Sequence, residues 1–250
     1  MRQLTALFLL LVCATAFGQQ KDSAQVSKKE LYSKKFDFKN RANDHFMLQF
    51  GYDGWVSKPD SINVTGFSRH FNAYVFIDKP FKTDPRWSAA IGAGVGSSNI
   101  FFDKMSVRLA ANNQQQQVVF KDLADTNHFR KFKLTNVWLE APIELRFAAN
   151  PLNTNKSFKV ALGAKVGLMV SGYTKGRDFR NSDGQSIYSN KYILKEKDRS
   201  FFNSTRLAAT FRVAYGIFGI HGAYQILNLF RESSGPPVRP WSIGITISGL

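Results

Sequence analysis

The stretch Trp241-Ser242-Ile243-Gly244-Ile245-Thr246-Ile247-Ser248, near the C-terminus, decides the fold class. Its bulky apolar residues alternate strictly with Ser, Gly, Thr and Ser. Successive side chains of a β-strand point to opposite faces, so this segment has one apolar face and one face of small polar residues. In a helix the same residues would scatter around the axis. The stretch therefore predicts a strand with a single apolar side.

Seven further segments show this alternation, clearly in most and less cleanly in the first two, where aromatic residues fall on both faces. A segment such as 158–170 is long enough to cross a hydrocarbon layer when tilted, at about 3.3 Å per residue. We predict an all-β fold, an eight-stranded antiparallel up-and-down transmembrane β-barrel. The other expected strands are 46–55, 71–77, 87–95, 137–147, 158–170, 207–215 and 218–226.

The links between these segments alternate between long and short. Transmembrane barrels have short periplasmic turns and long surface loops, so the alternation predicts which links face the cell surface. The long links are 57–66, 99–131, 174–202 and 228–239, and the short ones are 79–86, 149–156 and 216–217. Within 99–131, the polar tract 112–117 lies between the segments 105–109 and 118–120 and predicts the tip of a hairpin that extends above the membrane.

A soluble eight-stranded barrel of lipocalin type is the structural alternative. Such a barrel buries its apolar face inward and shows water a polar exterior. Here the non-apolar face is dominated by Gly, Ala and Ser, which suit a cramped lumen better than a solvent-exposed surface. Aromatic residues near the strand ends also fit interface girdles of a membrane barrel. These are Phe81, Trp87, Phe147, Phe158, Tyr215 and Phe218 at the periplasmic side, and Trp55, Tyr173, Phe202 and Trp241 at the surface side.

The N-terminus has the features of a secretory signal peptide. Arg2 precedes a short apolar run, and small residues follow it, so we predict a signal peptide over 1–18 with cleavage after Gly18. We expect a flexible periplasmic segment over 19–45, which is polar and basic, and the barrel over 46–250. The only cysteine, Cys13, would leave with the signal peptide. These features predict export to the outer membrane of a Gram-negative cell.

The chain carries a formal net charge of +16, which indicates an anionic partner. Export disfavours nucleic acid, and no basic helix or zinc-finger spacing supports it. We expect outer-membrane lipid and lipopolysaccharide as partners, since cations near an anionic membrane surface bind it. The residues expected to contact lipopolysaccharide are Lys191, Lys195, Lys197 and Arg199.

Charged residues on the polar face should lie in the lumen, where they must pair because an isolated buried charge is costly. Glu140 and Glu144 share one strand, so a ladder of salt bridges to basic residues on the next two strands is expected. The alternative is a catalytic pair such as Glu144 or Asp53 with His221, whereas His70 has no evident partners in sequence. We predict no catalytic, cofactor or metal site. The expected lumen network is Asp53, Glu140, Glu144, Arg146, Lys159, Lys165, Arg206, Arg212 and His221.

The fourth and fifth expected strands carry a resemblance to a known family. The segment Asn136-Val137-Trp138-Leu139-Glu140-Ala141-Pro142-Ile143-Glu144-Leu145-Arg146 is similar to the "YLEIPLLLK"-type strand of PorT-like outer-membrane β-barrel domains. The Gly-rich segment 158–172, with Tyr173 next to it, resembles that family's following strand. The resemblance runs from about Phe46 to Leu250 and implies this barrel topology. It also implies, for some members, an association with secretion or gliding.

Three classes of function remain open at this stage. A structural or interaction barrel with a packed lumen is our first expectation, with protein partners bound through loops 99–131 and 174–202. A narrow porin-like channel is the alternative, although eight strands rarely leave an open lumen. An enzyme acting on lipid or peptide comes last, because no spacing suggests an assembled triad.

Overall fold

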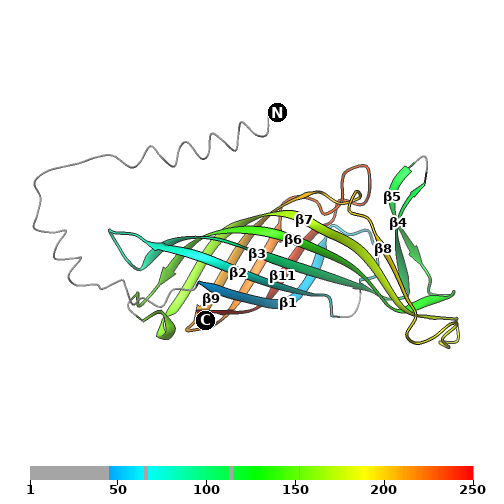
Figure 1. Cartoon of the computed structure of the whole chain (residues 1–250), viewed down its shortest axis with the longest axis horizontal. Coiled ribbons are helices and arrows are strands. Elements are labelled where there is room, and N and C mark those ends of the chain that lie inside the picture. The colour runs from blue at the N-terminus through cyan, green and yellow to red at the C-terminus, as the bar shows by residue number, and fades with distance from the viewer. Residues whose placement is uncertain (1–44, 65–66, 113–114, 152, 250) are drawn as a thin grey trace, which may run out of the picture. The chain divides into compact units, whose positions relative to one another are not determined.

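A computed structural model describes residues 45–64, 67–112, 115–151 and 153–249 (Figure 1). The expected signal peptide 1–18, and the expected segment 19–45 up to residue 44, lie outside these residues. Within them, no helix is both long and apolar enough to cross a membrane.

Eight strands form a closed antiparallel ring in the order β6-β3-β2-β1-β11-β10-β9-β7, and β6 pairs with β7 to complete it. The fold class predicted from the alternation is therefore confirmed. The barrel strands are β1 (Phe46–Val56), β2 (Arg69–Pro80), β3 (Trp87–Phe102), β6 (His128–Ala148), β7 (Phe158–Arg180), β9 (Thr205–Tyr215), β10 (Phe218–Gln225) and β11 (Arg239–Ser248).

The first and last strands close the ring, and glycine makes the closure tight. Gly51 of β1 lies opposite Gly244 of β11. A Cβ atom built on Gly51 would lie 2.4 Å from the Cα of Gly244, so neither position has room for a side chain. The small residues that alternate with isoleucine in β11 thus serve a close approach of two backbones.

The apolar face points outward along the strands. Ile243 and Ile245 are more than half exposed, whereas Ser242 and Thr246 are buried in the lumen. The same arrangement holds on β7, where exposed apolar residues run from Phe158 to Val170. At about 3.3 Å per residue and a tilt of about 40°, this run is about 30 Å tall, close to the apolar band of a transmembrane barrel.

The short turns lie at the end of the barrel where the described chain begins and ends. The link after β2 contains Asp84 and Arg86, whose side chains form an ion pair at 2.8 Å. The hydrogen bond from Arg86 lowers the pKa of Asp84 below its ordinary value. The predicted boundary of this link at residue 79 is wrong, because β2 continues to Pro80.

The long links 99–131 and 174–202 contain regular strands. The hairpin predicted within the first link is confirmed, because residues 105–112 pair with residues 115–122. The other strands in these links were not predicted. β3, β6 and β7 continue past the apolar band, and the hairpin of β4 (Met105–Asn112) and β5 (Gln115–Asp122) rises from the first link. In the second link, β8 (Ile193–Lys197) pairs with the end of β7. Figure 1 shows these extensions reaching past the ends of β1 and β2. We call the β4–β5 hairpin, β8 and the parts of β3, β6 and β7 beyond the band the headpiece.

A hydrophobic core fills the surface-side mouth of the barrel and continues into the headpiece. Trp55 lies at its centre, with ring centroids of Phe102, Phe230 and Phe120 at 5.7, 6.1 and 6.5 Å. The backbone of Val118 in β5 donates to the carbonyl of Ser234, which joins the hairpin to the last long link. We call this the mouth core.

Two aromatic residues expected in the surface-side girdle belong to this core instead. Trp55 is 8% exposed and Phe202 is fully buried. Trp55 shares the inward face of β1 with Asp53, so its side chain cannot reach lipid. The periplasmic-side residues Trp87, Phe158 and Tyr215 are exposed on the lipid-facing side, where a girdle requires them.

Candidate functional site

Glu140 lies at the centre of the lumen and gathers groups from three other strands. Its carboxylate accepts hydrogen bonds from Arg206 of β9 at 2.8 Å and Lys165 of β7 at 3.2 Å. The hydroxyl of Tyr74, on β2, also donates to it. All four side chains are buried. A carboxylate that accepts from two cations and a phenol ties the opposite walls of the barrel together.

Glu144 forms a second cluster nearer the periplasmic end. Arg212 and Arg146 donate to its carboxylate at 2.9 and 2.7 Å. Arg146 also lies 3.8 Å from Asp78 and stacks over the ring of Phe76. Asp78 is not among the residues expected in the lumen network, although it lies on the inward face of β2. Lys159, the remaining cation of the expected network, is likewise buried.

The third cluster joins two histidines. Nε2 of His70 lies 2.8 Å from Nε2 of His221, and Nδ1 of His70 lies 2.8 Å from Asp53. Nδ1 of His221 in turn lies 2.9 Å from the hydroxyl of Thr246. The partners of His70 are not evident in the sequence, because they come from β1 and β10. The inward parity of β2 was the one signal that could have found it.

The hydroxyl of Ser98 donates to Asp53 and so extends this cluster. Hydrolases that use a serine nucleophile need an imidazole between the hydroxyl and the carboxylate. Here the carboxylate of Asp53 lies between Ser98 and His70 instead. The chain of contacts suits a closed hydrogen-bond network, with every ring nitrogen engaged.

One small cavity lies beside these clusters. The cavity lined by Tyr74, Glu144, Lys165 and His221 has a volume of about 20 Å³. A cavity of that size holds about one water molecule. In the described part of the chain, no cluster of three or more metal-ligating side chains is placed to bind an ion.

A larger pocket, of about 310 Å³, lies in the headpiece. It is bounded by the β4–β5 hairpin on one side and by β6, β7 and the segment leading into β8 on the other. The two links expected to bind partners thus build one site together. The residues that line it include Arg108, Lys121, Phe129, Tyr188, Tyr192 and Glu196.

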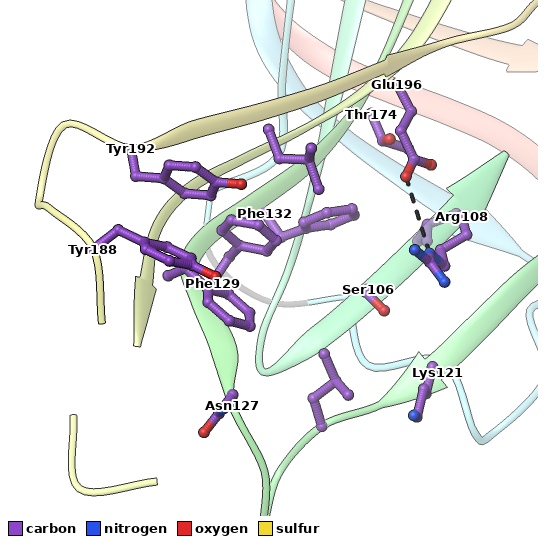
Figure 2. Close-up of a pocket in the computed structure, with 14 residues that line it drawn as sticks. Ser106, Arg108, Lys121, Asn127, Phe129, Phe132, Thr174, Tyr188, Tyr192 and Glu196 are labelled. Atoms are coloured by element: carbon purple, nitrogen blue, oxygen red, sulfur yellow. Dashed lines mark ion pairs between the residues drawn. The ribbon is translucent and has the colours of Figure 1, made fainter. Parts of the chain in front are cut away.

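Aromatic rings form one wall of the pocket (Figure 2). The centroids of Tyr188 and Tyr192 are 4.9 Å apart, and the ring of Phe129 is nearly parallel to that of Tyr192 at 6.4 Å. Phe179 stacks on Tyr188 and also contacts Phe129. Tyr188 is 68% exposed, so this wall is open to a ligand from outside.

Charged groups form the opposite wall. Figure 2 shows Arg108 and Lys121 across the pocket from the tyrosines. Arg108 lies 4.0 Å from Glu196, whose carboxylate accepts from the backbone of Leu109 at 3.2 Å. That hydrogen bond fixes β8 to the hairpin and positions the cation at the edge of the pocket.

The segment that carries the tyrosines is held by Asp178. This fully buried carboxylate lies 3.1 Å from Arg130 and 2.9 Å from Arg180, and it accepts from Ser186 at 2.6 Å. Because these three side chains come from different parts of the chain, their contacts with Asp178 fix the conformation of the segment. The pocket therefore has a preformed wall.

The sequence shares its pattern with a known family. It matches the family described as outer membrane protein beta-barrel domain over residues 23–231. The chain belongs to this family. As an outer-membrane β-barrel protein, it resides in the outer membrane.

A solved structure is distantly similar to this chain. Ail, the attachment invasion locus protein of Yersinia pestis, was solved in complex with the heparin analogue sucrose octasulfate; it is similar over 81% of this chain and 96% of its own, with 13% identity and a TM-score of 0.34. No curated protein matches the sequence.

The four residues expected to contact lipopolysaccharide lie on the surface of this outer-membrane barrel. Lys191, Lys195, Lys197 and Arg199 are all exposed. Lys195 and Lys197 belong to β8, where Lys195 stacks over the ring of Tyr173 at 4.2 Å. Lys191 precedes β8 and Arg199 follows it.

Proposed function

We propose that the protein is a closed outer-membrane anchor that holds a protein-binding headpiece at the cell surface. The observation that carries the proposal is the aromatic pocket between the two long links, built on strands that continue directly from the barrel. Such strands give the pocket a rigid base, which loops alone would lack. The resemblance to PorT-like domains extends the proposal to an accessory role in secretion or gliding machinery.

The filled lumen favours an anchor over the narrow channel. Ion-paired clusters at Glu140 and Glu144 bridge opposite walls, and the mouth core closes the surface side. A solute would have to displace both. We therefore propose that the barrel does not conduct.

A protein is the partner that the pocket suits best. Tyrosine and arginine are the residues enriched at binding hot spots, because they offer a rigid apolar body with a polar end. The pocket combines Tyr188 and Tyr192 with Arg108 across an opening that fits one large apolar side chain. An acidic neighbour on that partner segment would meet Arg108 and Lys121.

We propose no catalytic role. The only histidines that meet in the described chain, His70 and His221, are 3% and 4% exposed. They lie in the lumen with Asp53, where no surface substrate would reach them.

Site-specific photo-crosslinking in intact cells tests the proposal. A photoreactive residue at position 188 should give a discrete protein adduct, and Arg108→Ala should reduce its yield. The matched control places the photoreactive residue at position 60, where Asp60 is exposed in the first long link, and it should give no adduct. Equal adducts at both positions would refute a specific pocket.

Planar-bilayer recording tests the lumen independently. The purified protein should show no single-channel events, while an open porin run beside it does. Reproducible conductance steps would overturn the closed anchor and favour the channel.

A further inference from the structure

The outer wall of the headpiece carries a cluster of cations arranged by strand register. One row of paired residues runs Arg69, Asn99, Thr135, Tyr173, Lys197 from β2 to β8. The next runs Phe101, Lys133, Lys175, Lys195, and the third runs Lys131, Arg177, Ile193. Directly paired residues in antiparallel strands share a face. We call this surface the basic wall.

The rows continue the lipid-facing side of the barrel upward. Val95 and Leu139 are paired and about half exposed, and Asn99 and Thr135 are the pair four residues further along the same faces. The basic wall is therefore the outer surface, while the pocket of Figure 2 lies on the inner side of the same strands.

Carboxylates are kept off this wall. Seven of the twelve described residues in the three rows are Lys or Arg, and none is Asp or Glu. The nearby acids Asp178 and Glu196 point to the inner side, where they meet Arg130 and Arg108. The wall thus keeps its positive charge instead of neutralising it internally.

Aromatic rings and one amide hold the cations in place. Arg69 and Lys133 both lie over the ring of Phe101, at 5.2 and 5.8 Å, and Lys195 lies over Tyr173. Lys133 also donates to the side chain of Asn99 at 2.7 Å. Ordered cations lose less conformational entropy when they bind an anion, so these contacts prepare the wall for a ligand.

The height of the wall selects the ligand. With a rise of about 3.3 Å per residue and a tilt of about 40°, Arg69 lies about 5 Å above Phe71, the last exposed apolar residue of β2. On β7, Lys175 and Arg177 lie about 12 and 17 Å above Val170 by the same measure. A phospholipid headgroup reaches only the lowest of these cations above the apolar band, whereas a phosphorylated saccharide headgroup is tall enough to reach all of them.

We infer that the basic wall binds the phosphorylated saccharide headgroup of an outer-leaflet glycolipid of lipopolysaccharide type. Arg69 and Lys133 meet the phosphates nearest the hydrocarbon, and Lys175, Arg177 and Lys195 meet those further out. Of the four contact residues expected from sequence, Lys195 and Lys197 belong to the wall, and Lys191 and Arg199 lie outside its rows.

The test compares two triple variants of the full-length protein in a zwitterionic detergent. Lys133→Gln, Lys175→Gln and Lys195→Gln remove three wall cations. The control, Lys79→Gln, Lys82→Gln and Lys156→Gln, removes three exposed cations at the periplasmic end. The probes are rough lipopolysaccharide, the same lipid after phosphatase treatment, and phosphatidylglycerol. Native mass spectrometry measures the affinity.

The wall variant should bind intact lipopolysaccharide on the order of 100-fold more weakly at low salt, since each cation near an anionic surface contributes a factor of about five. The control should bind like the wild type, and raising salt should weaken the wild type. Lys→Arg replacements at the three wall positions keep the charge and should keep the binding, which separates charge from misfolding. If the wild type bound the phosphatase-treated lipid or phosphatidylglycerol as tightly as intact lipopolysaccharide, the inference would be overturned. It would also be overturned if the two Gln triple variants bound lipopolysaccharide equally well.

Discussion

The imidazoles of His70 and His221 meet at 2.8 Å inside the lumen, although 151 residues separate them in sequence. One order of ring protons satisfies every contact in this chain of side chains. In it, Nδ1 of His70 donates to Asp53, Nε2 of His221 donates to Nε2 of His70, and Nδ1 of His221 accepts from Thr246. In this series of hydrogen bonds, each donor faces an acceptor.

Replacement of one histidine should break this order. His221→Leu removes the partner of Nε2 of His70 and of the Thr246 hydroxyl, and we expect a loss of about 1–3 kcal/mol in the free energy of unfolding. His221→Gln, which keeps one donor and one acceptor, should lose less. Urea unfolding in lipid vesicles measures both. A leucine variant as stable as the wild type would show that the contact contributes nothing.

Glu140 should matter more than the histidine pair, because it compensates two cations. Glu140→Gln leaves Lys165 and Arg206 buried without a countercharge, and the expected cost is about 3–5 kcal/mol. Surface Asp84→Asn removes a carboxylate paired with an exposed arginine and should leave the free energy of unfolding nearly unchanged. The same unfolding experiment compares them, and similar losses would contradict a stabilising ion cluster in the lumen.

The barrel could be predicted because lipid imposes one rule on every outward residue. In β7 and β11 the outward residues are apolar and the inward ones are small or charged, so a period of two marks both the strand and its facing. The register could not be predicted in the same way. Whether His70 meets His221 depends on how β2, β1, β11 and β10 are staggered around the ring, and alternation alone leaves that stagger open.

The extensions of β3, β6 and β7 in the headpiece were missed because the rule reverses above the membrane. In β6 the outward residues change from Leu139 to Lys133 and Lys131, while the inward ones change from Glu140 to Leu134 and Phe132. The period of two continues, but water now lies outside and the apolar core inside. Reading apolar residues as lipid-facing therefore ended the strand too early. The same reversal placed Trp55 and Phe202 in the girdle rather than in the mouth core.

A charge at the lipid face should disturb assembly. Ile245 is 56% exposed within the apolar band, so Ile245→Arg should destabilise the barrel by about 2–4 kcal/mol. Ile245→Leu keeps an apolar side chain of the same size and should be tolerated. Folded protein is measured by gel mobility before and after boiling. If the arginine variant assembles as well as the leucine variant, this face of β11 does not meet lipid.

The mouth core should depend on Trp55. Trp55→Ala removes the ring that contacts Phe102, Phe120 and Phe230, and cavity formation should cost about 3–5 kcal/mol. Trp87→Ala, which removes an exposed ring at the periplasmic side, should cost less. Access of a small thiol reagent to Ser98→Cys, just below the mouth core, reports opening and should rise only in the Trp55 variant. An unchanged labelling rate would show that the lumen is closed by other groups.

Asp178 holds the segment that bears Tyr188 and Tyr192. Its φ of 61° lies in the left-handed region, which Asn tolerates and Ala does not. Asp178→Asn therefore removes the charge and one of the two acceptor oxygens, whereas Asp178→Ala removes the ion pairs with Arg130 and Arg180 and the hydrogen bond from Ser186, and it strains the backbone. Loss of about 1.5 kcal/mol of hydrogen bonding to charged groups corresponds to about a tenfold rise in local opening.

Trypsin cleavage after Lys191 in intact outer membranes should therefore be about tenfold faster in the Ala variant and intermediate in the Asn variant. The unfolding of the barrel should be unchanged in both, because Asp178 lies beyond the apolar band. Crosslinking from position 188 should fall in step with the cleavage rate, since both depend on the same wall of the pocket. Faster cleavage with undiminished crosslinking would mean that the partner orders this segment itself, and the preformed wall would then be wrong.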